Sequence, residues 1–249
     1  MIVTLKGNSE IEGFKEAGRI AGLILGHLLD SLSVGVVPTD IDDLARELCK
    51  KHNVIPTFLG YLGFPAAICF SKNNVMVHGI PDSTPLKEGD LVTVDFGATL
   101  DGFIGDTADT VRLSKQATLI ENCCSEALYD AISCSIAGNR LSDIGKTITK
   151  IATDNKYSIP INYGGHGIDR YYLHSPPFVA NLQDVDDITL TNGMIFAIEP
   201  MFIDSESNNT KIAVDNWSVV ADGETVHCEH TILINDDRPI ILTNRRKDA

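Results

Sequence analysis

The chain has 249 residues, of which 43% are hydrophobic and 22% charged, a composition typical of globular proteins that fold without disulfides. A formal net charge of −14 argues against a nucleic-acid-binding surface, because such a surface needs clustered lysine and arginine. The six cysteines form no C-x-x-C pair and no secretion signal is recognisable, so we expect reduced thiols. The apolar run at residues 20–29 is too short to span a membrane.

Two helices are predicted at the start of the chain. Ser9 and Glu12 have the spacing of a capping box, and a helix of roughly five turns follows, with apolar or small residues on one face at Ile11, Phe14, Gly18, Ala21, Leu25 and Leu28. A second helix is expected after Pro38, with Thr39 as N-cap and an apolar stripe at Ile41, Leu44, Ala45 and Leu48. Strand-like runs follow at residues 66–71 and 91–99.

The same order of elements then repeats. The offset is 103 residues from Gly35 to Gly138 and 104 residues from Asp95 to Glu199. Three short sequence matches in the same order favour a duplication, with halves at approximately 1–110 and 111–249 that together form a single domain about a pseudo-twofold axis. The later helices are predicted at 115–138 and from Ser142, and the later strands near 194–199, 217–221 and 230–234.

Asp95 and Asp106 are the first carboxylates that point to chemistry. The segment 92–111 is typical of a β-hairpin with Asp101-Gly102 at its turn. Asp106 would then face Gly97, and Asp95 would lie two residues further along the same face. A single aspartate near a turn is usually solvated. Two neighbouring carboxylates in strands this apolar repel each other unless a cation lies between them, so the pair favours a metal site.

Glu199 and Glu229 form a second pair, and each adjoins an apolar strand. Glu199 ends the run that starts at residue 194, and Glu229 precedes the run 231–234. A carboxylate joined to a strand core is rarely unpaired, because burying a lone charge is costly. His166 lies in a glycine-rich turn, Gly-Gly-His-Gly, where a histidine is as often structural as it is a metal ligand.

One histidine with four carboxylates makes an oxygen-rich ligand set. It suits a pair of Mn, Fe or Co ions about 3.5–4 Å apart, bridged by carboxylates and a water. Structural zinc sites instead favour closely spaced cysteine and histidine. The run His-Cys-Glu-His at 227–230 lacks the H-E-x-x-H spacing of a zinc-protease helix and falls in a predicted strand, so we reject that motif.

Five stretches of the sequence are distinctive: 73–81 (NNVMVHGIP), the hairpin 95–106, 165–168 (GHGI), 198–201 (IEPM) and 229–231 (EHT). Through these stretches, and over essentially its whole length, the chain resembles the type I methionine aminopeptidases of family M24. The resemblance implies an α+β pita-bread fold, in which two pseudo-twofold-related α/β halves share an antiparallel sheet core flanked by helices. It also implies a metalloaminopeptidase that removes initiator methionine from nascent proteins and peptides and prefers a small second residue.

The resemblance implies a role for each ligand. Asp95 would chelate one metal ion, and His166 and Glu199 would complete the other. Asp106 and Glu229 would bridge both. The cofactors would be two divalent ions per chain from the set Co, Mn, Fe, Zn and Ni. A bridging water or hydroxide would attack the first peptide bond, with Glu199 as proton acceptor.

Two further histidines and an apolar pocket would handle the substrate. By resemblance, His174 would steady the oxyanion, and His78 would meet the scissile amide or the next residue's backbone. A closed apolar pocket suits the thioether of methionine. The resemblance gives its lining as Tyr61, Phe64, Cys69, Trp217, Phe58 and Leu173.

Two alternatives on the same fold stay open. An aminopeptidase P or prolidase usually carries an additional N-terminal domain, whereas here a helix is predicted by residue 10. A catalytically inactive pita-bread binding module would have lost metal ligands, and all five are intact here. We expect a cytoplasmic monomer of the bacterial or organellar type that contacts ribosomes transiently and binds neither membranes nor specific nucleic acids.

Overall fold

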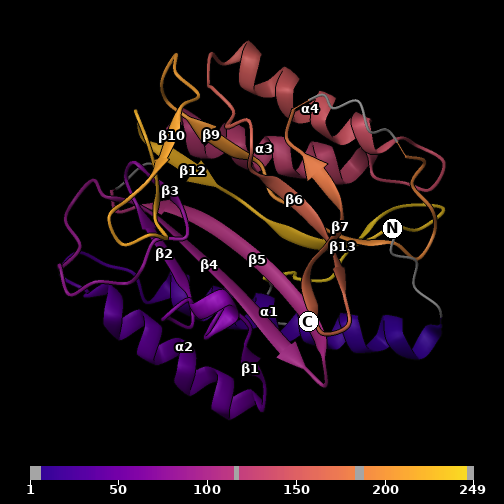
Figure 1. The fold of residues 1–249 in the computed structure, drawn as a ribbon, viewed down its shortest axis with the longest axis horizontal. Helices are drawn as coiled ribbons and strands as arrows, with labels where there is room; N and C mark the ends of the chain where they lie inside the picture. Colours follow the sequence, from indigo (N-terminus) through magenta and orange to yellow (C-terminus); the bar gives the residue numbers. More distant parts are fainter. Residues whose placement is uncertain (1–6, 115–117, 183–187, 246–249) are drawn as a thin grey trace.

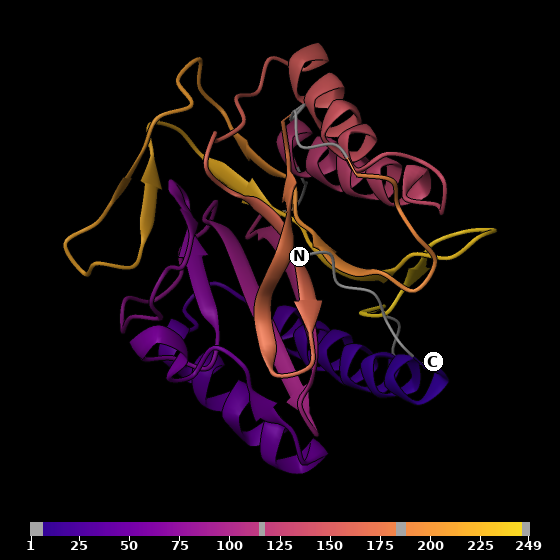
Figure 2. The same ribbon diagram turned by 45° about the vertical axis from the view of Figure 1, so that its right-hand side comes forward.

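The structure, a computed structural model, describes residues 7–114, 118–182 and 188–245. Helices form two outer layers, and strands lie between them (Figure 1). The turned view separates the side that carries α1 and α2 from the side that carries α3 and α4 (Figure 2). The helices are α1 (Asn8–Asp30), α2 (Pro38–His52), α3 (Leu119–Cys134) and α4 (Leu141–Asp154), with a short 3-10 turn at Tyr61–Gly63.

The first two helices form as predicted, but their starts differ. α1 begins at Asn8 after Gly7, and no side chain caps it, so the predicted capping box at Ser9 is wrong. α2 begins at Pro38 with Val37 at the N-cap, so Thr39 is not the cap. Proline suits the first helical position because its missing N–H would have no partner there. The apolar faces of both helices pack on β4 in one core cluster.

A long hairpin crosses the centre of the molecule. It consists of β4 (Leu91–Leu100) and β5 (Phe103–Arg112), which place Gly97 opposite Asp106 and confirm the predicted register. Both turn residues, Asp101 and Gly102, have positive φ, as a two-residue hairpin loop of Asp-Gly type requires. β4 also pairs with β1 (Ile55–Pro56) and with β2 (Cys69–Lys72), which begins three residues later than predicted.

The other large sheet has the strand order β14-β13-β8-β6-β7. The structure corrects one local prediction here, because His166 lies within the β6–β7 hairpin and not in a glycine-rich turn. A Cβ at Gly165 would lie 2.1 Å from the Ala197 carbonyl oxygen, and one at Gly167 would lie 2.2 Å from the Pro176 oxygen. These glycines therefore allow neighbouring strands to approach closely. The five strands are β6 (Gly164–Asp169), β7 (Tyr172–Ala180), β8 (Ile195–Ile198), β13 (His230–Leu233) and β14 (Ile240–Ile241).

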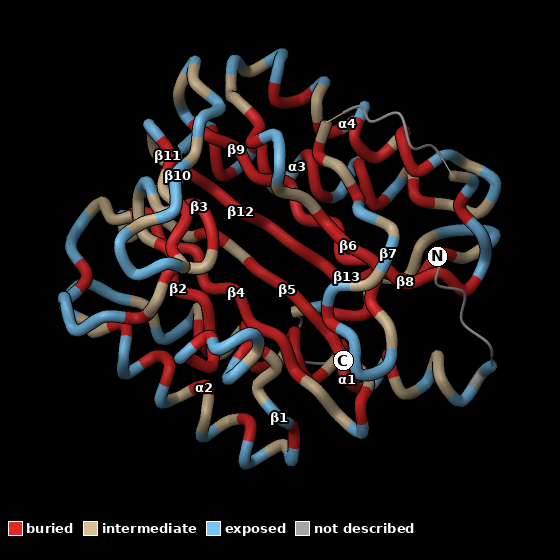
Figure 3. The backbone as a smooth tube through the Cα atoms, viewed as in Figure 1, coloured by how far each residue is buried: buried red, intermediate tan, exposed pale blue. Residues whose placement is uncertain are grey.

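Short strands close one end of the central layer. β12 pairs with β9, and β11 joins β10 to β3. Buried backbone follows β4, β5, β12 and β13 through the middle of the molecule (Figure 3). A second core cluster packs α3 and α4 against β8 and β13. The short strands are β3 (Val75–Val77), β9 (Met201–Ile203), β10 (Thr210–Ile212), β11 (Val219–Ala221) and β12 (Thr225–His227).

Two further properties of the described residues bear on the predictions. All six cysteines are free thiols, as expected. No helix within the described ranges has both the length and the apolarity needed to cross a bilayer. The division into halves near residue 110 stays a prediction.

The Thr231 side chain on β13 forms hydrogen bonds to β5 of the other large sheet, and its replacement should destabilise the fold. The Thr231 hydroxyl accepts a hydrogen bond from the Asp106 amide (2.8 Å) and donates one to the Asp106 carbonyl (2.7 Å). Thr231→Val keeps the shape but leaves both buried groups unsatisfied, so we expect a loss of about 1–3 kcal/mol in the free energy of unfolding. Urea titration measures this loss, and Thr153→Val on the exposed face of α4 is the control. A loss no larger than the control's would contradict the linking role.

Candidate metal centre and active site

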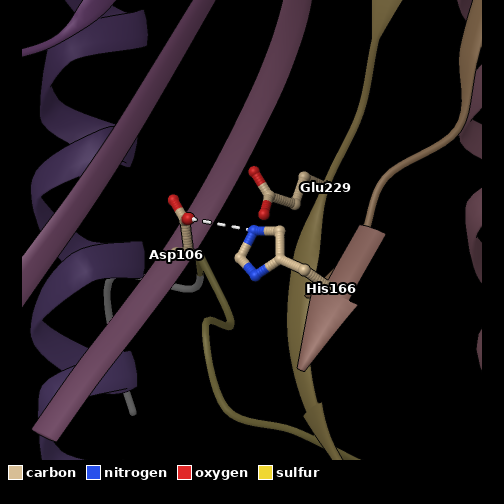
Figure 4. Close-up of side chains that lie close together, drawn as sticks. All are labelled: Asp106, His166 and Glu229. Atoms are coloured by element: carbon tan, nitrogen blue, oxygen red, sulfur yellow. Dashed lines mark ion pairs between the residues drawn. The ribbon is translucent and has the colours of Figure 1, made fainter. Parts of the chain in front are cut away.

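Four carboxylates and one imidazole converge between the two large sheets. Their side chains come from β4, β5 and β6 and from the residues next to β8 and β13, and all are at least nine-tenths buried. His166 Nε2 lies 3.8 Å from Asp106 Oδ2 and 3.6 Å from Glu199 Oε1. Asp106, His166 and Glu229 offer ligand atoms within 4.8 Å of one another (Figure 4). The five residues are Asp95, Asp106, His166, Glu199 and Glu229.

Strand register explains how distant residues meet here. Asp95 and Asp106 share one face of the β4–β5 hairpin. In the β8–β13 pair His230 lies opposite Ile198, so the next step along each strand brings Glu229 beside Glu199. The Glu229 amide donates to the Ala108 carbonyl at 2.8 Å, which holds this second pair against β5. Two carboxylate pairs, each set by antiparallel register, therefore face each other.

Burial and mutual repulsion dominate the electrostatics of this cluster. Burial raises the pKa of Asp106 to about 7. It also raises the pKa of Asp95, Glu199 and Glu229 well above the usual range, and the neighbouring carboxylates raise these pKa values further. Asp95 Oδ1, Asp106 Oδ1 and Glu229 Oε1 are buried without a hydrogen-bond partner among the described residues. A buried oxygen-rich set that repels itself fits divalent cations, which would satisfy these oxygens and favour the ionised carboxylates.

His166 is oriented to offer a lone pair to this cluster. Its Nδ1 lies 3.1 Å from the Gly167 carbonyl, which can only accept, so Nδ1 carries the proton. Nε2 then faces the carboxylates with its lone pair free. Burial lowers the pKa of His166 to about 3, so the ring is neutral near pH 7. A neutral imidazole held by a backbone carbonyl is the usual form of a metal-binding histidine.

A cavity of about 580 Å³ opens over the carboxylates. Phe64 and Trp217 meet edge to face at its wall, with ring centroids 5.1 Å apart. Its apolar part provides aromatic surroundings that suit an unbranched apolar side chain. All six residues predicted for a substrate pocket line this cavity: Phe58, Tyr61, Phe64, Cys69, Leu173 and Trp217.

Both predicted substrate histidines also line the cavity. His174, on β7, lies with Nδ1 2.8 Å from the Tyr61 hydroxyl, and its ring contacts the His166 ring at 4.4 Å between centroids. His78 has a φ of 58°, in the left-handed region that is uncommon for residues other than glycine, although histidine adopts it more readily than most. Burial and the nearby His174 lower the pKa of His78 to about 4.

Sequence reasoning missed His227, a buried histidine of the cavity that lies beside the carboxylates. His227, the last residue of β12, lies 2% exposed in the cavity wall with Nε2 3.4 Å from Glu199 Oε2. Burial lowers its pKa to about 3, and the nearby His78 adds to the effect. The sequence signal was the run at 227–230, which we tested only as a zinc-protease helix. Residues 228 and 229 in fact connect β12 to β13, so the whole run is not a strand.

Comparison with known proteins agrees with this geometry. The model of metallopeptidase family M24 matches residues 12–236. A methionine aminopeptidase of Clostridium acetobutylicum is 38% identical over 249 residues, covering 97% of this chain and 99% of the relative. Methionine aminopeptidase 1 of Bacillus subtilis is 36% identical over 248 residues, covering 97% and 99%.

Solved structures agree on the fold. The methionine aminopeptidase of Thermotoga maritima superposes with a TM-score of 0.93 at 33% identity, covering 98% of this chain and all of that one. The prolidase of Pyrococcus furiosus reaches a TM-score of 0.77 at 18% identity, with 66% of its chain covered, and so shares the fold alone. The expected pita-bread fold is thereby confirmed. The chain belongs to metallopeptidase family M24.

Proposed function

We propose that this chain is a methionyl aminopeptidase that removes the initiator methionine from new proteins. The observation that carries the proposal is the junction of two features: a buried carboxylate and imidazole cluster forms one wall of a cavity whose remaining lining is largely apolar and aromatic. An apolar recess of this kind accepts an unbranched thioether side chain. The near full-length similarity to methionine aminopeptidases supports methionine over other side chains.

Two divalent ions fit the five buried ligands. Asp95 would hold one ion, His166 and Glu199 the other, and Asp106 and Glu229 would bridge them. Bound ions supply the Lewis acidity that activates water and polarises a carbonyl. A ligand set of carboxylate oxygens and one imidazole nitrogen is compatible with each of Co, Mn, Fe, Zn and Ni, so the ligand types alone do not select one of these metals.

The chain's own residues position the substrate and move its protons. Glu199 accepts a proton from the attacking water as the water oxygen bonds to the carbonyl carbon of the first peptide bond. The Tyr61 hydroxyl lies 2.8 Å from Nδ1 of His174. In the tautomer that this role requires, Nδ1 accepts from Tyr61, and the Nε2 proton of His174 is left for the negative charge that develops on the carbonyl oxygen. His78 contacts the scissile amide, whose nitrogen gains the proton as the carbon–nitrogen bond breaks.

Metal add-back kinetics on a peptide panel test the proposal. We expect chelator-treated protein to be inactive and to recover cleavage of Met-Ala-Ser with Co or Mn. Met-Xaa-Ser peptides with a large second residue should be cleaved more slowly than Met-Ala-Ser. Rapid cleavage of Xaa-Pro peptides with inert Met-Ala-Ser would favour a prolidase. Failure both to bind Co or Mn and to regain peptidase activity would favour an inactive binding module.

A further inference from the structure

His227 is a buried histidine whose hydrogen bonds are unaccounted for. It is 2% exposed and lines the cavity, and neither ring nitrogen has a hydrogen-bond partner among the described residues. Burying an unsatisfied polar group is costly, so native proteins rarely leave both nitrogens of a ring unpaired. The ring therefore needs a partner that the described part of the chain does not supply.

The nearest atoms to this ring indicate what that partner is. His227 Nε2 lies 3.4 Å from Glu199 Oε2 and 4.0 Å from Glu229 Oε2. His166 Nε2 lies 3.6 Å from the other Glu199 oxygen and 3.8 Å from Asp106 Oδ2. The imidazoles of His166 and His227 thus lie on either oxygen of Glu199, and each is also within 4.0 Å of one further carboxylate. Atoms that bind one metal ion at about 2.0–2.2 Å lie roughly 3–4 Å apart, and each of these four separations falls in that range.

The backbone of His227 is fixed independently of any ion. Its amide donates to the Thr110 hydroxyl at 2.9 Å, and that hydroxyl donates to the His227 carbonyl at 2.8 Å. Register on β9 places it opposite Met201. The imidazole is therefore presented by two neighbouring strands in a preorganised position, as a metal ligand needs to be.

We propose that His227 is a second imidazole ligand of the metal centre, binding through Nε2 the ion that Glu199 and Glu229 also contact. The inference rests on the metal centre of the proposed function but not on the identity of the substrate. With His227, the ligand set contains two imidazole nitrogens beside its four carboxylates. Imidazole suits Zn, Fe and Ni, and Co lies between Fe and Ni in the general order of metal affinities, whereas carboxylate suits Mn. His227 therefore raises affinity for Co more than for Mn.

His227→Gln tests the proposal, because glutamine stays polar but provides no imidazole. Calorimetric titration of the chelator-treated variant with Co and with Mn should give at least about 10-fold weaker Co binding, the lower end of what even an outer-shell loss costs. Mn affinity should fall less. Proton NMR of the Co-loaded protein should lose one of two exchangeable, hyperfine-shifted imidazole N–H resonances. His166→Gln should lose the other.

A matched control and a second variant keep the test decisive. His230 is equally buried, but its Nδ1 is hydrogen-bonded to Thr243 at 2.9 Å, so His230→Gln should retain Co affinity and both resonances. If His227→Gln does not fold, as judged by circular dichroism without metal, His227→Asn replaces it. Co affinity within about threefold of wild type with both resonances intact would overturn the proposal. Cleavage of Met-Ala-Ser by the wild-type protein tests the proposed function separately, because that activity can be present whether or not His227 binds metal.

Discussion

Asp106→Asn is expected to lower kcat/KM for Met-Ala-Ser by at least about 10³-fold. Asparagine keeps the shape of the side chain but removes the charge with which Asp106 would bridge two ions. Metal ions contribute several kcal/mol of transition-state stabilisation, and each 1.4 kcal/mol corresponds to a tenfold change in rate. Metal analysis after gel filtration should find fewer than two ions per chain in the variant.

The same substitution should stabilise the protein when no metal is bound. Asp106 is buried among three other carboxylates that raise one another's pKa, and asparagine removes one contributor to their repulsion. We expect the Tm of the chelator-treated variant to exceed that of wild type by at least about 2 °C, the shift that 1 kcal/mol produces in a chain of this size. Adding Co should raise the Tm of wild type far more than that of the variant.

The pH dependence of the metal-free protein has a definite sign. A carboxyl group whose pKa is raised on folding contributes stability below its unfolded pKa, and that contribution is lost as pH rises through the folded pKa. For Asp106 the folded pKa is about 7, so metal-free wild type should be less stable at pH 8 than at pH 5. Asp106→Asn should reduce this difference. Asp101→Asn, at the exposed turn of the same hairpin, is the control. If Co raised the Tm of Asp106→Asn as much as it raised the Tm of Asp101→Asn, the role of Asp106 as a metal ligand would be contradicted.

Local patterns predicted the parts of this site that depend on one hairpin. The face shared by Asp95 and Asp106 follows from the period-two alternation of strands and from a turn sequence, both of which are visible in the residues. The meeting of Glu199 with Glu229 depends on the pairing of β8 with β13. Both glutamates could be nominated from their places beside apolar runs, but their adjacency could not be calculated without that register.

Tertiary contacts explain the local errors. The glycines around His166 indicated a turn, yet in the structure they let β6 lie close to β7 and β8. Ser9 and Thr39 have capping side chains, yet each lies inside its helix, and the observed N-caps are two positions earlier, at Gly7 and Val37. His227 was overlooked because the carboxylate nearest its ring belongs to Glu199, 28 positions before it, and because the cavity exists only in the folded chain.

His174→Ala is expected to lower kcat for Met-Ala-Ser by about 10²–10³-fold, the usual loss when one donor to an oxyanion is removed. KM should change little, because the Nε2 proton acts on charge that develops only in the transition state. Among the described residues, His174 makes no ion pair with any of the four carboxylates, in contrast to His166, which lies within 4.0 Å of two of them. The variant should therefore bind two Co ions with wild-type affinity.

Tyr61→Phe separates the role of the His174 ring from that of its orientation. The Tyr61 hydroxyl lies 2.8 Å from Nδ1 of His174, and its loss leaves the ring present but free to adopt the other tautomer. We expect a smaller fall in kcat than for His174→Ala, again with both ions retained.

If His174→Ala instead lost Co along with activity, His174 would be holding metal. If kcat were unchanged while KM rose, the ring would only bind substrate, since a group that stabilises the transition state alone must lower kcat when it is removed.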